Sequence, residues 1–219
     1  LFSNNLDKNK KCPKIIGITG TNGKTSTLLL LAEALMIRKN KIGVISSEGI
    51  GIFPKLRENS YTTPTLDIIY KNYNEFLISE CDYIIIECSS QGLHQGRLKG
   101  ILFDYALITN IYSDHLDYHR TLSGYIDSKL QLINQSKVAV LNYDSPVLRR
   151  INNTKHKLTK IYYVSQTKQS MKNQIKVKKC YSENNLERFH ISSILLIIAI
   201  MKREKIKDNL IKKSLSKLS

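Results

Sequence analysis

The sequence predicts an α/β fold in which helices cover both faces of a mostly parallel β-sheet. Short continuous apolar runs, such as Tyr83 to Glu87, alternate with segments of helical periodicity, which is typical of strands buried on both faces. The first run leads through a glycine-rich loop, Thr19 to Thr25, into a helix. Polar residues end three of the runs, as expected where parallel strands stop at a ligand site.

In chain order, the apolar run Ile15 to Thr19 predicts the first strand, and the leucine-rich segment Thr25 to Lys39 predicts the helix after the loop. A second apolar strand is expected at Ile42 to Ser46. Two glycines within Glu48 to Phe53 indicate a hairpin or a close approach of two backbones. Tyr61 to Pro64 is expected to be a loop.

Leu66 to Ser79 follows as a helix, because its apolar residues recur at helical spacing. The alternation then continues, with strands expected at Tyr83 to Glu87, Tyr105 to Thr109, Val138 to Leu141 and Ile161 to Val164, and helices at Thr121 to Gln135, Pro146 to Ile151, Phe189 to Lys202 and Ile206 to Leu218. After Gln166 the chain becomes polar, and we expect a small antiparallel part near Lys168 to Ser182.

The 219 residues suffice for one sizeable core. We expect residues 1–14 to be a linker or the end of a preceding domain, and residues 15–219 to form one domain. The opening segment lacks the shape of a signal peptide, and the longest apolar run, Ile191 to Met201, is shorter than the roughly 18 residues of a membrane span. Four cysteines without CxxC spacing indicate reduced thiols and a cytoplasmic protein.

The formal net charge of +16 is consistent with a nucleic-acid partner. However, the lysines are spread along the whole chain, and neither an RNA-binding signature nor a basic stripe with interleaved aromatic residues accompanies them. A non-catalytic basic module that binds nucleic acid is therefore an alternative that the sequence does not favour. The charge would also attract anions such as ATP and nucleotide sugars.

The stretch IIGITGTNGKTST, which begins at residue 15, has the pattern of a phosphate-binding loop. Gly20 and Gly23 allow backbone conformations that a side chain would forbid, so the amides can point at an anion. The helix that follows adds the partial positive charge of its N-terminus. Lys24 would reach the terminal phosphates, and the Thr25 hydroxyl would ligate Mg²⁺. The stretch departs from the common pattern at Ile18, where glycine is usual.

Two further strand ends carry polar residues that we expect to meet this loop. Glu87 closes a buried strand, which is where a Mg²⁺ ligand is needed beside a phosphate loop. The segment Asn110 to His119 holds two histidines and two aspartates close together. A capped turn before the helix at Thr121 would explain Asp117 but not the whole cluster.

The chain resembles the central, ATP-binding domain of the Mur ligases, and above all the MurE type. The matching stretches are GITGTNGKTST, YTTPTLD, ECSSQGLHQGRL, TNIYSDHLDYH, YIDSK and LNYDSP, which run in the family's order and cover most of Ile15 to Pro146. The phosphate loop is shared by all Mur and folylpolyglutamate ligases, whereas the TTP and ESSxGLxQxR segments are specific to the MurE type. The resemblance implies a P-loop-type Mur ligase central domain.

The resemblance also implies a role for each matching residue. The ATP phosphates would be held by Gly20, Thr21, Asn22, Gly23, Lys24, Thr25 and Ser26. The UDP-muramoyl substrate would contact Thr62, Thr63, Ser89, Gln95 and Arg97. The Mg²⁺ ligands would be Thr25, Glu87, His115 and Lys129, the last after CO₂ converts its amine to a carbamate that holds a second ion. The catalytic residues would be Lys24, Lys129 and His115.

By resemblance, the chain is part of an ATP-dependent amide ligase of peptidoglycan-precursor synthesis. ATP would phosphorylate the free carboxylate of UDP-N-acetylmuramoyl-L-alanyl-D-glutamate. The amine of a diamino acid, either meso-diaminopimelate or L-lysine, would then attack the acyl phosphate. A folylpolyglutamate-type ligase is the alternative within this chemistry, and Thr62, Thr63 and Arg97 argue against it.

The sequence departs from the family at several positions. Gln91 stands where many relatives have His, and His190 and Ser193 replace the two asparagines that contact adenine in the family. The family's UDP-binding first domain, its third domain and the DNPR-type motif that selects the amino acid have no match in the sequence. We therefore expect the N- and C-terminal Mur ligase domains to be partners that this chain needs for turnover.

Overall fold

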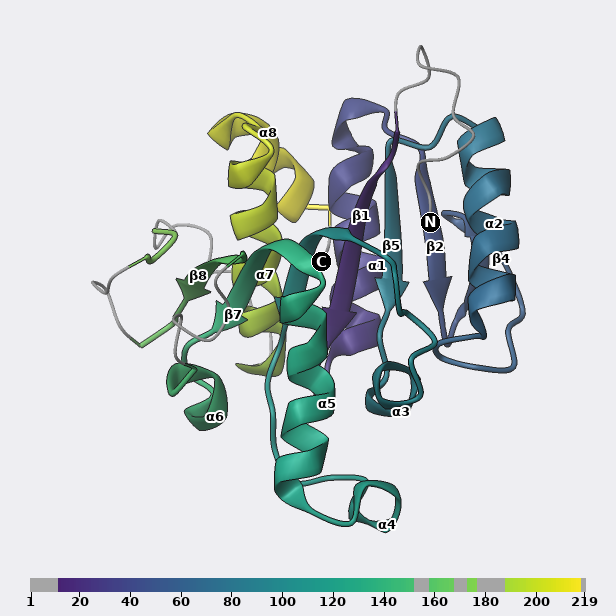
Figure 1. Cartoon of the computed structure of the whole chain (residues 1–219). Helices are drawn as coiled ribbons and strands as arrows, with labels where there is room; N and C mark the ends of the chain where they lie inside the picture. Colours follow the sequence, from purple (N-terminus) through teal and green to yellow (C-terminus); the bar gives the residue numbers. More distant parts are fainter. Residues whose placement is uncertain (1–11, 152–157, 168–172, 177–187, 218–219) are drawn as a thin grey trace.

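The computed structural model describes residues 12–151, 158–167, 173–176 and 188–217, with the backbone alone for 188–190. Within them, eight strands form one sheet in the order β4-β3-β2-β5-β1-β6-β7-β8 (Figure 1). Six strands are parallel: β1 (Lys14–Thr19), β2 (Ile42–Ser46), β5 (Tyr83–Glu87), β6 (Phe103–Ile108), β7 (Ser136–Asn142) and β8 (Lys160–Val164). The remaining two, β3 (Gly49–Ile52) and β4 (Lys55–Arg57), extend one edge in antiparallel pairing.

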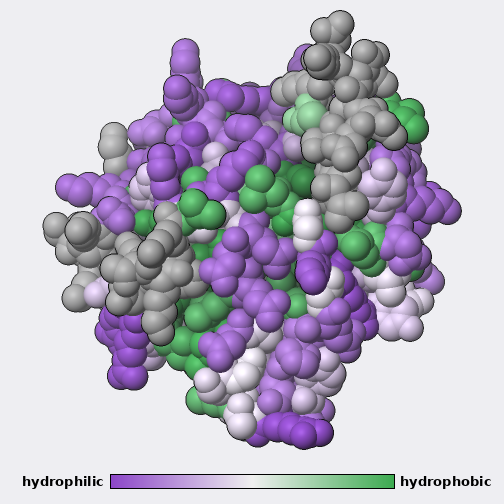
Figure 2. All heavy atoms as spheres, in the orientation of Figure 1, coloured by the Kyte–Doolittle hydropathy of each residue, from purple (hydrophilic) through white to green (hydrophobic). Residues whose placement is uncertain are grey.

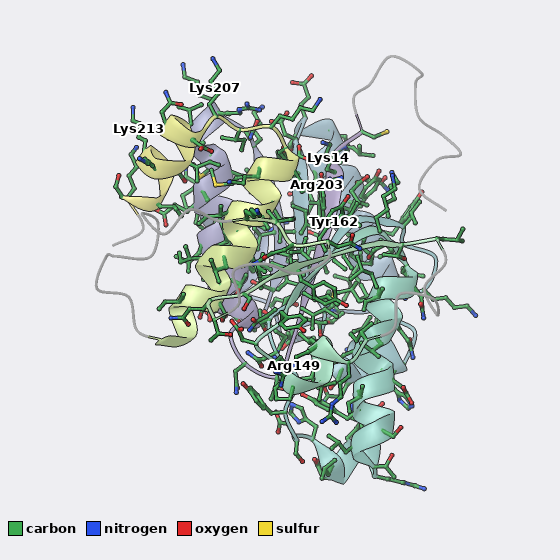
Figure 3. All side chains as sticks on the ribbon, turned by 90° about the vertical axis from the view of Figure 1, so that its left-hand side faces the viewer. Lys14, Arg149, Tyr162, Arg203, Lys207 and Lys213 are labelled. Carbon is green, nitrogen blue, oxygen red and sulfur yellow. The ribbon has the colours of Figure 1, made fainter. Side chains whose placement is uncertain are left out.

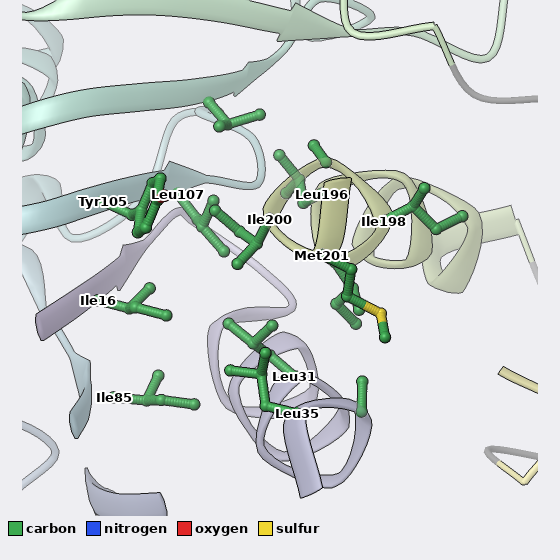
Figure 4. Packing of buried hydrophobic residues seen from close by; sticks show 14 of the residues in the cluster. Ile16, Leu31, Leu35, Ile85, Tyr105, Leu107, Leu196, Ile198, Ile200 and Met201 are labelled. Carbon is green, nitrogen blue, oxygen red and sulfur yellow. The ribbon is translucent and has the colours of Figure 1, made fainter. Parts of the chain in front are cut away.

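Helices cover both faces of the sheet. On one face, α1 (Lys24–Leu35), α7 (Arg188–Arg203) and α8 (Asp208–Leu215) share an apolar cluster with strand residues such as Ile16 and Leu107 (Figure 4). The other face is covered by α2 (Leu66–Ile78), α3 (Ser90–His94), α5 (Leu122–Asn134) and α6 (Pro146–Arg149). A 3₁₀-helix, η1 (Met36–Arg38), follows α1, and α4 (Leu116–His119) packs beside α5.

β1 fixes the positions of the helices that pack on its two faces. Because successive strand residues face opposite sides, Ile16 belongs to the cluster under α1 and α7, and Ile15 belongs to the cluster on the other face. Gly17 allows close packing on that second face, since a Cβ there would lie 2.7 Å from Leu132 Cδ1 of α5. Core packing on the two faces therefore determines where α1 and α5 lie, and with them the position of the loop after β1.

The mostly parallel sheet with flanking helices confirms the predicted fold class. Glu48 to Phe53, expected to be a hairpin or a close approach of two backbones, holds the single strand β3, and a Cβ on its Gly49 would lie 2.4 Å from Arg57 O of β4. The short elements α3, α4 and β4 were not predicted, because segments of three to five residues leave no periodic pattern. The antiparallel part expected near Lys168 to Ser182 falls largely outside the described residues. Within 173–176, Gln174 instead makes an isolated parallel bridge to Tyr163.

The surface is largely polar, as the composition requires. Figure 2 shows hydrophilic side chains over most of one face, with hydrophobic ones between them. On another face the basic residues are spread out, with Lys213 on α8, Lys207 just before it, and Arg149 well apart from both (Figure 3). None of the helices formed by the described residues combines the length and the apolar character that a membrane crossing requires.

A buried carboxylate joins three strands to the end of α7. Glu204 accepts hydrogen bonds from Lys14 Nζ at 2.6 Å, from the Tyr83 hydroxyl at 2.7 Å and from the Tyr105 hydroxyl at 2.6 Å. Burial alone would raise the pKa of this carboxyl, but the hydrogen bonds from Lys14 and the two tyrosines outweigh burial and lower the pKa. The charged form of Glu204 therefore holds α7 against β1, β5 and β6.

We expect Glu204→Gln to lower the free energy of unfolding by about 1–3 kcal/mol at neutral pH, because the amide loses the charge and one acceptor oxygen. The folded-state pKa of Glu204 is lowered, so its stabilisation is present above the ordinary carboxyl pKa and is lost as the pH falls through the folded-state value. Urea denaturation at neutral and acidic pH measures both effects.

The matched control is Glu75→Gln, because the ion pair of Glu75 with Arg57 is exposed on both sides. This control should lower the free energy of unfolding by less than about 1 kcal/mol at neutral pH. Equal losses for the Glu204 and Glu75 variants, or a Glu204 effect that persists in acid, would contradict the role given to the buried carboxylate.

Candidate active site

The phosphate loop lies between β1 and α1 at the carboxyl edge of the sheet (Figure 1). Gly20 and Gly23 have φ angles of 155° and 77°. A Cβ on Gly20 would lie 1.9 Å from Thr109 Oγ1, so only glycine lets the loop close against the end of β6. α1 begins at Gly23 without a side-chain cap, which leaves amides of its first turn available to an anion.

Two lysines converge on the carbonyl groups of this loop. Lys24 Nζ donates to the carbonyl oxygens of Gly20 at 3.2 Å and of Thr21 at 3.1 Å. Lys129 Nζ donates to Gly20 O at 2.7 Å and lies 4.6 Å from the centroid of the Tyr125 ring. Lys24 and Lys129, the two lysines expected to be catalytic, therefore donate to the same carbonyl oxygen, that of Gly20.

The protonation of these lysines is set by their surroundings. Burial, and after it the charge of Lys24, lowers the pKa of Lys129 to about 7. Burial also lowers the pKa of Lys24, against the attraction of Glu87 and Asp114. Because burial disfavours the protonated form of both amines, an anion bound beside them would stabilise that form and relieve both penalties.

Glu87 is 2% exposed at the end of β5, next to the loop. Its Oε1 accepts a hydrogen bond from the Thr25 hydroxyl at 3.0 Å, and its Oε2 accepts from the amide and the hydroxyl of Ser47 at 3.2 and 3.1 Å. A carboxylate and two hydroxyl groups thus meet here, which are oxygen ligands of the kind that Mg²⁺ takes. Ser47 was not predicted, although it follows the strand Ile42 to Ser46 and the strand-end argument applies to it equally.

The segment after β6 closes the loop on its other side. The carbonyl oxygen of Asn110 accepts from Thr21 N at 2.9 Å, and its side-chain Oδ1 accepts from Asn22 N at 3.0 Å. Tyr112 N donates to Thr21 Oγ1 at 2.9 Å. Ser26 lies exposed in the first turn of α1. The predicted meeting of the three polar strand ends is therefore confirmed.

Four of the five residues expected to contact the muramoyl substrate form one hydrogen-bonded group. The Thr63 hydroxyl donates to Glu87 O at 2.7 Å and accepts from Ser89 N at 2.8 Å. Arg97 Nη1 donates to Thr63 O at 2.7 Å, and Arg97 Nε donates to Gln95 Oε1 at 2.8 Å. Because Glu87 belongs to both groups, the candidate substrate residues adjoin the candidate metal residues directly.

Two expected site residues are not brought into these contacts. Thr62 is partly exposed, and its side chain makes no hydrogen bond among the described residues. His115 lies against its neighbour, with Nε2 3.5 Å from Asp114 Oδ2, and its ring centroid is 6.2 Å from that of Tyr125. No contact between the side chains of His115 and Glu87 is described.

The N-terminal part of α7 packs behind the phosphate loop. Ser193 is buried, and its hydroxyl oxygen lies 2.8 Å from Thr27 Oγ1. A Cβ on Gly23 would lie 3.8 Å from the same serine oxygen. The side chain of His190 lies outside the described residues. Ser193 therefore stands in the wall of the loop, and the resemblance gives this position to one of the asparagines expected to contact adenine.

These residues fit a nucleoside triphosphate with Mg²⁺. The loop offers an uncapped helix start, a glycine at position 20 that lets it close against Thr109, and Lys24, whose Nζ lies on the loop carbonyls. Thr25 and Glu87 would supply two oxygen ligands. The part of the chain that the structure describes has no group of three His, Cys, Asp or Glu side chains around one ion position. Mg²⁺ does not need one, because it takes most of its ligands from phosphates and water.

Comparison with known proteins agrees with this geometry. Residues 18–207 match the family described as Mur ligase middle domain. A UDP-N-acetylmuramoyl-L-alanyl-D-glutamate–2,6-diaminopimelate ligase of Helicobacter pylori is 34% identical over 174 residues, which are 78% of this chain and 39% of that protein. The ligase of the same name from Coxiella burnetii is 38% identical over 153 residues, 68% of this chain and 31% of that protein.

Solved structures give the same result for the fold. A 2,6-diaminopimelate ligase of this kind matches with a TM-score of 0.80 and 25% identity, covering 97% of this chain and 47% of the other. An FPGS–AMPPCP complex matches with a TM-score of 0.65 at 13% identity, covering 94% of this chain and 64% of that one, and this shows a shared fold only. With a family match from the end of β1 to the start of α8, the chain belongs to the Mur ligase family as a middle domain.

Proposed function

We propose that this chain is the ATP-binding part of a ligase that joins a diamino acid to UDP-N-acetylmuramoyl-L-alanyl-D-glutamate. The supporting observation is that Glu87 touches the phosphate loop through Thr25 and the candidate substrate group through Thr63. The relatives named above are 2,6-diaminopimelate ligases, which favours diaminopimelate over L-lysine. The chain spans 39% and 31% of those relatives, so we propose the whole reaction for the chain together with N- and C-terminal Mur ligase domains.

In the proposed reaction, the γ-phosphoryl group of ATP passes to the free carboxylate of the muramoyl dipeptide, giving an acyl phosphate and ADP. The amine nitrogen of the diamino acid then attacks the acyl carbon, phosphate leaves, and loss of a proton from nitrogen completes the peptide bond. Lys24 would turn from the loop carbonyls to the terminal phosphates and neutralise charge on the transferred group. Arg97 would hold an anionic group of the muramoyl substrate.

Mg²⁺ would be held by Thr25 and Glu87, and when bound it supplies charge neutralisation at the phosphates. We propose His115 as a further ligand, which requires its side chain to leave Asp114. Lys129 is proposed to carry a carbamate that holds a second ion. Its position supports this, because a buried amine with a pKa near 7 is largely neutral at physiological pH, and only the neutral amine can attack CO₂.

We expect carbamate on Lys129 to increase as the pH rises from about 6 to about 8, because the neutral fraction of an amine with a pKa of about 7 rises over this interval. The ¹³C NMR spectrum of the protein in ¹³C-labelled bicarbonate measures it without any turnover. Lys129→Arg should abolish the signal, since arginine keeps the charge but stays protonated. A signal that is absent at pH 8, or that survives the substitution, would exclude a carbamate at this position.

The proposal includes a cytoplasmic location, where ATP and UDP-linked substrates are available. A folylpolyglutamate-type ligase is less well supported, because the likeness to FPGS is one of fold only. A coupled phosphate-release assay on the chain with its flanking domains separates the two. Release should require the UDP-muramoyl dipeptide and diaminopimelate together. Release with a folate and glutamate in their place would overturn the proposed substrate.

A further inference from the structure

A tyrosine outside the residues assigned above, Tyr118, contacts the candidate substrate group from α4. Gln95 Nε2 donates a hydrogen bond to the Tyr118 hydroxyl at 3.0 Å, and His94 Nδ1 lies 3.1 Å from the same oxygen. α3, which ends at His94, and α4 both lie at the carboxyl edge of the sheet (Figure 1). Tyr118 is therefore in direct contact with residues that the proposed function assigns to substrate binding.

The hydrogen-bond partners fix the Gln95 amide in one orientation. Arg97 Nε can only donate, so the amide oxygen of Gln95 must face Arg97 and the amide nitrogen must face Tyr118. The tyrosine hydroxyl then accepts from Gln95, and its other contact, with His94 Nδ1, takes the direction set by the histidine tautomer. A continuous path of hydrogen bonds results, from Tyr118 through Gln95 to Arg97.

This path continues to the centre of the site. Arg97 Nη1 donates to Thr63 O, and the Thr63 hydroxyl donates to Glu87 O. The guanidinium carbon of Arg97 also lies 5.5 Å from the centroid of the Tyr61 ring. The direction of the remaining N–H groups of Arg97 is therefore set by contacts to Gln95, Thr63 and Tyr61, and a shift of Gln95 would release one of the three.

The ring of Tyr118 is itself held in place by two histidines. Its centroid lies 4.7 Å from that of His119 and 5.5 Å from that of His94, both close to edge-on. His119 is buried and packs edge-on against Tyr125 in turn. Burial first, and then the nearby His94 and His115, lowers the pKa of His119, so its ring is neutral at pH 7 and supports Tyr118 as an apolar surface.

We propose that Tyr118 is a positioning residue, whose hydroxyl orients Gln95 and, through it, the Arg97 guanidinium for the anionic muramoyl dipeptide. The inference rests on the proposed function, because it names the substrate that Arg97 would hold. It adds a link within the site as well. Tyr118 lies three residues after His115, so its hydroxyl connects the segment with the proposed metal ligand to the residues proposed to bind the muramoyl substrate.

The test is Tyr118→Phe, which keeps the ring and its contacts with the histidines and removes only the hydroxyl. In steady-state assays on the chain with its flanking domains, KM for the muramoyl dipeptide should rise roughly 3- to 10-fold, the effect of one lost hydrogen bond. KM for ATP and the thermal midpoint should stay unchanged. Tyr162→Phe is the control, because it removes a tyrosine hydroxyl whose partner, Arg203 Nη1 at 3.2 Å, lies outside the residues assigned to the site.

A double variant tests whether Tyr118 acts through Gln95 or independently of it. Gln95→Ala should raise KM for the muramoyl dipeptide, and adding Tyr118→Phe should raise it no further, because the tyrosine acts through Gln95. An unchanged KM for the dipeptide in Tyr118→Phe would overturn the proposal. A parallel rise in KM for ATP, or a fall in the thermal midpoint, would also overturn it in favour of a structural role.

The failure of the proposed function gives a different result. If the wild-type enzyme does not use the muramoyl dipeptide, the substrate assignment is wrong, and ¹⁵N NMR of the chain then tests the hydrogen-bond path alone. The side-chain amide signal of Gln95 and the Nε signal of Arg97 should both shift in Tyr118→Phe and stay in place in Tyr162→Phe. Unchanged signals in Tyr118→Phe would reject the path itself.

Discussion

Replacing Lys24 by alanine is expected to weaken the binding of Mg²⁺–ATP by roughly 10- to 100-fold, the range of a lost hydrogen bond to a charged partner. In the described structure, Lys24 Nζ donates to two neutral carbonyl oxygens of the loop. Phosphate oxygens would replace these acceptors with charged ones, and charge-assisted hydrogen bonds are about twice as strong. The variant should keep its fold, because Lys24 is not one of the residues that form the core clusters.

Titration calorimetry on the wild type and the variant measures this loss. Lys212→Ala is the matched control, since Lys212 is exposed on α8 and removes the same charge from the same chain. If attraction by the net charge of +16 were the main source of ATP affinity, the two variants would lose equally little. Equal affinities of Lys24→Ala and wild type would rule out the loop as the phosphate site.

The phosphate loop could be predicted because the residues that define it lie close together in the sequence. The loop after β1 needs glycine at two positions for backbone reasons, and a buried strand precedes it within a few residues. The same reasoning places Glu87 at the end of β5, and the structure brings it to Thr25. Ser47 was open to this reasoning as well, because it too follows a strand, and it was overlooked.

Other features depend on contacts that no local pattern contains. The hydrogen bond from Gln95 to Tyr118 joins residues 23 positions apart, one directly after α3 and one in α4, and both helices are too short to show periodicity. The burial of Lys129, which shifts its pKa to about 7, follows from how α5 packs on β1. The resemblance to a family indicated that Lys129 matters, but only the packed structure supplies a physical argument for the proposed carbamate.

The chain alone is expected to bind ATP and yet to release phosphate at least about 100-fold more slowly than the enzyme with its flanking domains. The reaction needs the dipeptide carboxylate and the γ-phosphate held at near-attack distance, and a misplacement of about 1 Å can cost on the order of 100-fold. The loop and Glu87 are in place in this chain, which supports nucleotide binding. The relatives it matches are about twice as long as this chain, and we propose that their other parts hold the uridine end and the amino acid.

The measurement is coupled phosphate release with UDP-muramoyl dipeptide and either diaminopimelate or lysine, on the chain alone and with separately supplied flanking domains. ATP binding by the same sample, measured by calorimetry, shows that the chain is folded. Turnover that appears only when the flanking domains are added would support a reaction shared between them and this chain. The site in this chain would then supply phosphoryl transfer. Rapid turnover by the chain alone would mean that residues 12–217 hold both substrates without help, and the proposed need for flanking domains would then be wrong. If ATP binds but no mixture turns over, the departures at Ser193 and His190 would be the reason, because bound nucleotide is then not placed for transfer. Replacing both residues by asparagine would test this directly.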